Sequence, residues 1–210
     1  MPTQRIPAVF FLLAIAIALA PSHSSAQTTV SASIYGAFNG ATNGNGTQQS
    51  PANQAGGLVE LRHTSNPILG FEGTYSFNRA DQSYSRMVAV PVCPAPPCAP
   101  FIQTLHVPAN AHEITANWVP SVHIANVRPF GVLGVGVLLN VPSNSSGSST
   151  NTTPVYVYGA GLDWGLIPHI GLRLQYRGNL YKAPNLNQLY SSTDAFTHNA
   201  EPIIGIYFRL

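Results

Sequence analysis

Apolar and polar residues alternate along most of the chain, in short segments that begin near residue 29. In residues 69–77 the odd positions carry Leu, Phe, Gly, Tyr and Phe, whereas the even positions carry Gly, Glu, Thr and Ser. The same pattern returns in residues 172–177 and 204–210. A period of two places one kind of side chain on each face of a β-strand, whereas an amphipathic helix has a period of 3.6. The sequence therefore predicts an all-β protein.

The alternating segments are eight in number, and the connections between them differ in length in a regular order. We expect strands at residues 29–39, 57–64, 68–78, 110–122, 128–140, 154–164, 170–182 and 197–210. Long connections at 40–56, 79–109, 141–153 and 183–196 alternate with short ones at 65–67, 123–127 and 165–169. Strands that run up and down in this way place all long loops at one end, and eight of them suffice to close a barrel. In residues 128–140 both faces are apolar or Gly, so the inward face of this strand stays open.

The scarcity of charge indicates which face of the barrel meets solvent. Only 8% of the 210 residues are Asp, Glu, Lys or Arg, against about 25% in an average soluble domain. A soluble eight-stranded barrel with an apolar interior would need more charge outside, whereas a membrane-spanning barrel turns its apolar face to lipid and its polar, Gly-rich face inward. Aromatic residues on the apolar face suit the two membrane interfaces, and we assign this role to Phe71, Phe77, Trp118, Tyr156, Trp164 and Tyr176. We predict an eight-stranded antiparallel up-and-down transmembrane β-barrel, porin-like in its alternation. A net charge of +2 offers no basic patch for nucleic acid.

The N-terminus has the three parts of a secretory signal peptide. Arg5 precedes an apolar run at residues 6–20, and small residues follow up to Ala26. The run is shorter than the roughly 20 residues of a membrane-spanning helix. We expect residues 1–26 to be a cleaved leader for the Sec pathway and residues 27–210 to be the barrel domain, located in the bacterial outer membrane.

Most of the acidic residues and half of the basic residues of the mature chain fall on the predicted inner face. The expected lumen network consists of Glu60, Arg62, Glu72, Glu113, Asp163, Arg173, Arg177, Glu201 and Arg209. A hairpin centred on residues 66–67 places Arg62 opposite Glu72, and a hairpin centred near Pro168 places Asp163 opposite Arg173. We also expect Arg177 to lie near Glu201. Charges in a narrow lumen must be paired, so the sequence predicts a filled lumen and no open channel.

The longest loop carries the only two cysteines. Cys93 and Cys98 are separated by four residues, and an exported chain meets an oxidising compartment, so we predict a disulfide that staples this loop. Exposed apolar residues in the loop 79–109 would suit recognition of a partner. Alternatively, the segment continues the third and fourth strands above the membrane.

Two motifs near the C-terminus resemble the OmpA-like outer-membrane β-barrel family. They are Tyr-Gly-Ala-Gly-Leu-Asp-Trp at 158–164 and Gly-Leu-Arg-Leu-Gln-Tyr-Arg at 171–177. The C-terminal segment looks like the signal that the barrel assembly machinery reads, with Gly205, Phe208 and Leu210 at its key positions. It departs from that signal in ending with Leu and in having Ile203 where a polar residue is usual. The resemblance implies outer-membrane lipid, lipopolysaccharide and the assembly machinery as partners, and we expect no peptidoglycan-binding domain after the last strand.

These features favour a small outer-membrane protein with a structural, envelope-integrity or surface-interaction role, and we expect no catalysis, cofactor or metal. One alternative is an adhesin that acts through the stapled loop 79–109. Another is a lipid A-modifying enzyme, for which Ser191, Ser192, Asp194 and His198 form the nearest constellation. The seven His residues are scattered, without the spacing of a zinc site.

Overall fold

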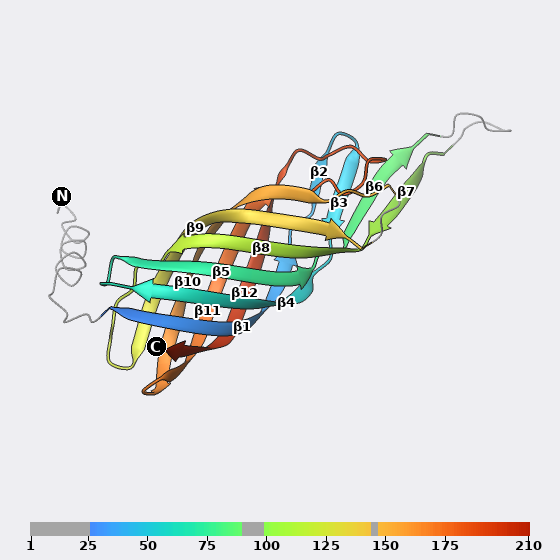
Figure 1. The fold of residues 1–210 in the computed structure, drawn as a ribbon. Helices are drawn as coiled ribbons and strands as arrows, with labels where there is room; N and C mark the ends of the chain where they lie inside the picture. The colour runs from blue at the N-terminus through green and yellow to red at the C-terminus, as the bar shows by residue number, and fades with distance from the viewer. Residues whose placement is uncertain (1–25, 90–98, 144–146) are drawn as a thin grey trace, which may run out of the picture.

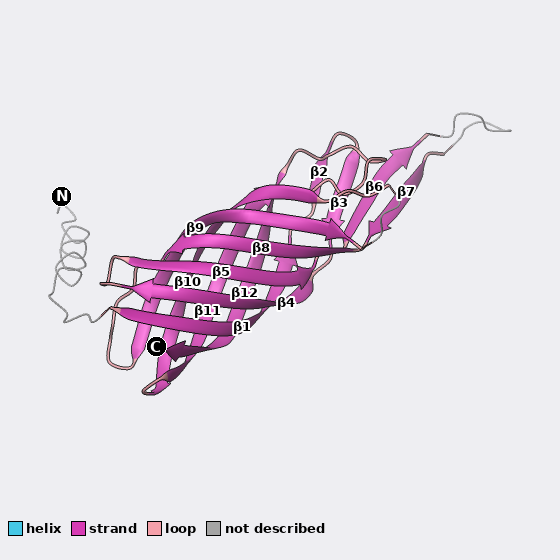
Figure 2. Ribbon diagram, in the orientation of Figure 1, coloured by secondary structure: helices cyan, strands magenta, loops and turns pink. Residues whose placement is uncertain are grey.

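The structure, a computed structural model, describes residues 26–89, 99–143 and 147–210. The predicted leader up to residue 25 and both Cys93 and Cys98 lie outside these ranges. The described residues form strands joined by loops (Figure 2). Within these ranges no helix is long and apolar enough to cross a membrane.

Eight strands form a closed antiparallel barrel, as the alternation predicts (Figure 1). In chain order they are β1 (Gln27–Asn39), β4 (Gln54–Thr64), β5 (Gly70–Arg79), β8 (Ala109–Trp118), β9 (Val127–Pro142), β10 (Asn151–Ile167), β11 (Ile170–Lys182) and β12 (Phe196–Arg209). Each strand pairs with its barrel neighbours in sequence, and β1 pairs with β12 to close the wall. β8 ends at Trp118 rather than at residue 122, because Pro120 has no N–H group to continue the ladder.

A second sheet lies at the long-loop end of the barrel, in segments that we expected to be loops. It contains β2 (Thr42–Gly44), β3 (Thr47–Pro51), β6 (Gln82–Val88) and β7 (Phe101–Val107), in the order β2-β3-β6-β7. Figure 1 shows β6 and β7 projecting beyond the barrel. Two residues separate β5 from β6, and one separates β7 from β8, so the alternative in which the third and fourth strands continue above the membrane is realised in part. Long loops of outer-membrane barrels face the cell exterior, so we call this the extracellular sheet.

The barrel wall buries polar residues and exposes apolar ones. In β5 the inward side chains include Glu72 and Thr74, which are buried, whereas Phe71 and Tyr75 are exposed. A water-soluble barrel would have the opposite parity, because apolar area would then leave water on folding. This arrangement instead places apolar side chains against the hydrocarbon of the lipid. The backbone N–H and C=O groups of every strand form hydrogen bonds with the two neighbouring strands.

The structure of β9 shows which side chains of residues 128–140 face the lumen. Phe130, Val132 and Leu138 are buried on the lumen side, and the side chains of Leu133 and Val135 face outward. The lumen thus has one apolar strip among its charged groups. Glycines share the inward face of this strand, and a Cβ atom on Gly136 would collide with the carbonyl oxygen of Ile114.

The two kinds of glycine in the wall predict opposite responses to substitution. Gly136→Val should lower the free energy of unfolding by about 1–3 kcal/mol, because the added atoms meet backbone that cannot move aside. Gly73→Val is the matched control, since a Cβ atom there points into open space on the outer wall. Urea unfolding in phospholipid vesicles, followed by tryptophan fluorescence, would measure both. Equal destabilisation by the two substitutions would contradict the assigned parity.

Candidate functional site

The half of the lumen nearer the short turns is filled by two arginines and three carboxylates. Arg62 lies opposite Glu72 in the hairpin register, with 2.6 Å between its Nη2 and Oε2 of Glu72. Arg173 lies opposite Asp163 and donates two hydrogen bonds to its carboxylate, at 2.7 and 2.9 Å. Both arginines also reach across the lumen, Arg62 to Asp163 at 3.1 Å and Arg173 to Glu60 at 3.0 Å. The five charges therefore form one network that joins opposite walls.

The ring of Phe130, from β9, packs against the two arginines of this network. Its ring lies 3.9 Å from the guanidinium carbon of Arg62 and 5.4 Å from that of Arg173. The negative face of an aromatic ring attracts a cation, most strongly where water is excluded. An apolar residue in a charged lumen thus has a physical role that the alternation pattern could not indicate.

A second cluster occupies the half nearer the extracellular sheet. Arg177 forms an ion pair with Glu113 across the lumen and lies 3.3 Å from Glu201 on the neighbouring strand. The Asn179 amide donates hydrogen bonds to Glu113 and Glu201, at 3.0 and 3.1 Å. Proximity of Arg177 to Glu201 follows from the register, but the partnership with Glu113 joins β8 to β11, which are not adjacent. Arg209 instead donates to the hydroxyl of Tyr207 and has no carboxylate partner in the described part of the chain.

The lumen is closed by these side chains. Arg62, Arg173 and Arg177 are each at most 2% exposed, so the network leaves no water-filled path along them. A hollow of about 20 Å³ borders Glu113 and Glu201, which is room for about one water molecule. The geometry is that of a plugged barrel rather than a diffusion channel.

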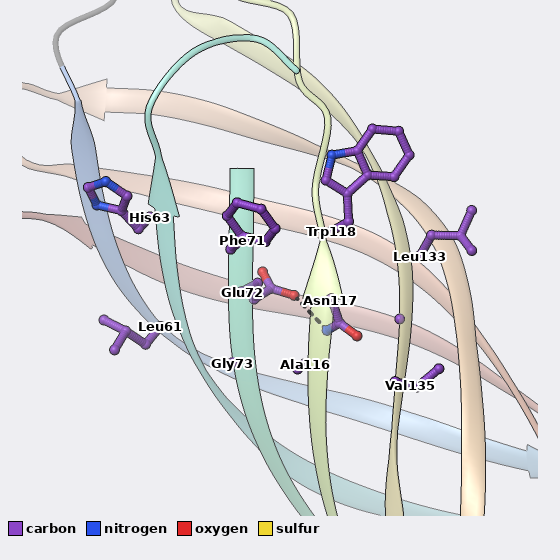
Figure 3. A pocket seen from close by; sticks show the side chains of 11 residues that line it. Leu61, His63, Phe71, Glu72, Gly73, Ala116, Asn117, Trp118, Leu133 and Val135 are labelled. Carbon is purple, nitrogen blue, oxygen red and sulfur yellow. Dashed lines mark hydrogen bonds between the residues drawn. The ribbon is translucent and has the colours of Figure 1, made fainter. Parts of the chain in front are cut away.

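The outer wall presents the aromatic residues that the sequence assigns to the membrane interfaces. Figure 3 shows the side chains of Phe71, Trp118 and Leu133 on the outside of the wall, with Glu72 and Asn117 on the other side, joined by a hydrogen bond of 3.2 Å. The aromatic positions are between 41% and 59% exposed, at Phe71, Phe77, Trp118, Tyr156, Trp164 and Tyr176. Such a wall matches lipid in chemistry on one side and a polar plug on the other.

The C-terminal strand closes the barrel against β1. Gly205 faces the lumen, and Phe208 faces outward. Leu210 follows the end of β12, and its N–H group donates to the carbonyl oxygen of Thr28 at 3.0 Å. Gly205 and Phe208 therefore lie on the strand that closes the barrel, and Leu210 continues its pairing with β1 by one hydrogen bond.

The extracellular sheet is tied to the last long loop through Tyr84. The Tyr84 hydroxyl donates to the carbonyl oxygen of Pro184 at 2.8 Å and accepts a hydrogen bond from the Leu186 N–H group at 3.0 Å. Leu186 and Tyr190 pack around it in a buried cluster, and burial raises the pKa of Tyr84 to about 12. One face of the sheet is thus covered by residues 183–195, and the other faces solvent.

The last described residue pairs of the β6–β7 hairpin carry exposed apolar side chains. Met87, Phe101 and Ile102 are 73%, 53% and 68% exposed. β7 carries no Asp, Glu, Lys, Arg or Pro and, within the described ranges, pairs only with β6. Exposed sheet edges are usually protected by such residues, so this edge is open to contact.

The residues considered for a lipid A-modifying enzyme do not form a catalytic arrangement. Ser192 hydrogen-bonds Asp194 at 3.4 Å, and Asp194 pairs with Lys182 at 2.6 Å. The His198 ring bonds the Tyr158 hydroxyl at 2.8 Å instead of a serine. In the described residues no group of three His, Cys, Asp or Glu side chains could hold a metal ion.

The fold and the two-sided wall define an integral outer-membrane β-barrel. The family model for the outer membrane protein beta-barrel domain matches residues 9–200, so the chain belongs to this family of the bacterial outer membrane. Neisserial surface protein A is similar in structure, with a TM-score of 0.59 and 13% identity over 89% of this chain and all of that one. No curated protein matches the sequence.

Two further solved structures share the fold. OprG from Pseudomonas aeruginosa has a TM-score of 0.56 and 11% identity over 90% of this chain and 98% of that one. Ail from Yersinia pestis, in complex with the heparin analogue sucrose octasulfate, has a TM-score of 0.51 and 15% identity over 89% and 100%. At this level of identity the likeness concerns the fold alone.

Removing Arg173 should destabilise the barrel strongly. Arg173→Met leaves Glu60 without its guanidinium partner and Asp163 with Arg62 alone, in a lumen that excludes water. We expect a loss of about 3–5 kcal/mol in the free energy of unfolding. Arg209→Met, at the edge of the lumen, should cost far less. Urea unfolding in vesicles would measure both. A loss for Arg173→Met no larger than that for Arg209→Met would refute a central role for the network.

Lowering the pH should release the tether between Lys182 and the last loop. The hydrogen bond and charge of Lys182 hold the pKa of Asp194 below its usual value, about 3.9. The pair therefore contributes stability above the usual pKa of aspartate and loses it as the pH falls through the lowered pKa. The chain has three Asp residues, so carboxyl NMR with labelled aspartate can follow Asp194 directly.

Two substitutions of Lys182 test the cause of this shift, one that removes its charge and one that keeps it. Lys182→Gln should raise the pKa of Asp194 toward 3.9 or so, whereas Lys182→Arg should keep it low. An unchanged titration in Lys182→Gln would show that the ion pair does not form in solution.

Proposed function

We propose that the protein is a non-enzymatic surface-interaction protein, in which the closed barrel is the membrane anchor and the extracellular sheet is the binding element. The observation that carries the proposal is the projecting β6–β7 hairpin with its exposed apolar end at Met87, Phe101 and Ile102. Monomeric soluble surfaces rarely gather large apolar side chains without a partner. The open edge of β7 adds backbone groups that an extended segment could join.

The closed lumen supports this proposal, because it leaves the exterior as the place for chemistry. The lumen network around Arg62, Arg173 and Arg177 then has the role of holding the barrel shut and rigid. A rigid anchor positions a projecting sheet better than a flexible tether would.

The charge of the extracellular sheet favours a partner of different chemistry from the sulfated ligand in the Ail structure. Arg86 is the only Lys or Arg residue in the four strands of the sheet. Its guanidinium already donates to Gln103 and to the carbonyl oxygen of Leu189. A polyanion would need several free cations, so we propose an uncharged partner surface.

We also propose three features of biogenesis from the residue patterns. Residues 1–26 are removed on Sec-dependent export, and the barrel assembly machinery reads Gly205, Phe208 and Leu210. Cys93 and Cys98 form a disulfide in the oxidising periplasm. Outer-membrane lipid and lipopolysaccharide surround the apolar wall.

The test removes the apolar end of the hairpin. Bacteria that express the triple variant Met87→Ser, Phe101→Ser and Ile102→Ser should lose most adherence to animal and plant cell surfaces and to one another, because the contact area is lost. Leu189→Ser is the control, since Leu189 is as exposed as Ile102 but lies in the last loop. Heat-modifiable gel migration would check assembly of each variant. The proposal would be refuted if the triple variant adhered as well as the parent protein. It would also be refuted if bacteria that express the parent protein adhered no better than bacteria with an empty vector.

A further inference from the structure

One row of side chains crosses the solvent face of the extracellular sheet. Asn43 lies opposite Gln48, Gln48 lies opposite Ser85, and Ser85 lies opposite Thr104, so four strands each contribute one hydrogen-bonding group. Neighbouring strands are about 4.8 Å apart, so three consecutive groups span roughly 10 Å. A continuous row of amides and hydroxyls on a rigid sheet is a recognition surface for a polar ligand.

A hollow of about 320 Å³ lies over this row. Its lining includes Asn43, Gln48 and Ser85, with Met87 and Ile102 on one side. The volume is at the lower end of the range for small-molecule sites, about 300–1,000 Å³. The hollow is therefore of a size for one or two sugar rings, with polar groups on one side and an apolar ledge on the other.

The amides in the hollow are free to bind. The side chains of Asn43 and Gln48 make no hydrogen bond to any other described residue, while Ser85 and Thr104 share one at 3.1 Å. Each amide offers both donors and an acceptor, which is the combination that sugar hydroxyl groups need. A solvated face with such groups aligned on neighbouring strands can engage adjacent hydroxyls of one ring.

The described lining of the hollow offers no free charge. The Arg86 residue borders it, but its guanidinium bonds Gln103 and Leu189 and lies 5.0 Å from the ring of Tyr190, on the covered face of the sheet. Among the described residues that line the hollow none is acidic. An anionic ligand would lose its hydration without gaining a counter-charge, so a neutral ligand is favoured.

From these observations we infer that the hollow binds a neutral saccharide. Ring hydroxyls bond the amides of Asn43 and Gln48 and the hydroxyl of Ser85, and the apolar C–H face of the ring packs on Met87 and Ile102. This inference rests on the proposed function, since it names the class of partner that the extracellular sheet recognises.

The experiment uses the full-length barrel refolded in detergent micelles and a printed array of neutral, sialylated and sulfated glycans. Neutral glycans should bind in preference to charged ones, and the best of them is then titrated by calorimetry. The double variant Asn43→Leu and Gln48→Leu should weaken binding by about tenfold or more, as expected for the loss of two or more uncharged hydrogen bonds. Ser50→Ala is the matched control, because Ser50 lies on the same face of β3 outside the hollow and should leave affinity unchanged.

Three results would overturn the inference: no neutral glycan binds, only charged glycans bind, or the double variant binds like the parent protein. Heat-modifiable migration confirms that each variant is assembled. Loss of adherence in the hairpin triple variant, together with a negative array, would leave the proposed function standing and reject the saccharide. Adherence of the triple variant equal to that of the parent protein, together with a negative array, would reject both the proposed function and the saccharide.

Discussion

The pairing of buried guanidinium and carboxylate groups across the lumen is the interaction on which the rest of the structure depends. Arg62 of β4 reaches Asp163 of β10, and Arg177 of β11 reaches Glu113 of β8. These strands are not neighbours in the wall, so the ion pairs act as struts between opposite sides. A barrel in lipid gains little from burying apolar side chains, because its outer face stays in contact with hydrocarbon. Hydrogen bonds in the wall and paired charges in the lumen must provide most of its stability.

The same interaction limits what the protein can do. Arginines this deeply buried fill the lumen and leave no selective water-filled path through it. Truncating one of them would leave its carboxylate partner as an unpaired charge in a site that excludes water. The proposed recognition therefore takes place on the extracellular sheet, where side chains meet water without that cost. The low proportion of charged residues follows from the same division, because the lipid-facing wall holds almost none.

Much of the barrel could be predicted from the sequence, because strand parity and short turns are local properties. The turn at Asn66 and Pro67 sets Arg62 opposite Glu72, and the register seen in the structure is the one that the turn predicts. The partnership of Glu113 with Arg177 could not be found in this way, because it joins strands far apart in the sequence. The alternation does not predict which face of β9 points inward, because both faces are apolar. The contact between Phe130 and the guanidinium groups explains which face lies inside.

The β2 and β3 strands of the extracellular sheet escaped prediction for a different reason. β3 reads Thr-Gln-Gln-Ser-Pro, and neither of its faces is apolar. Its buried face is held by polar contacts, since the Gln49 amide donates to Gln82 and to the carbonyl oxygen of Pro184. Hydrophobic periodicity detects strands that bury apolar side chains and is silent about strands that bury amides.

The only local signal in this region is the Asn45-Gly46 pair, both with positive φ, at the two-residue turn between β2 and β3. A sheet built from polar contacts on one face can present an uncharged polar surface on the other without needing an apolar core of its own. That construction suits a recognition surface, because the binding side chains stand on strands whose spacing is fixed, while the covered face is secured by Tyr84 and the last loop.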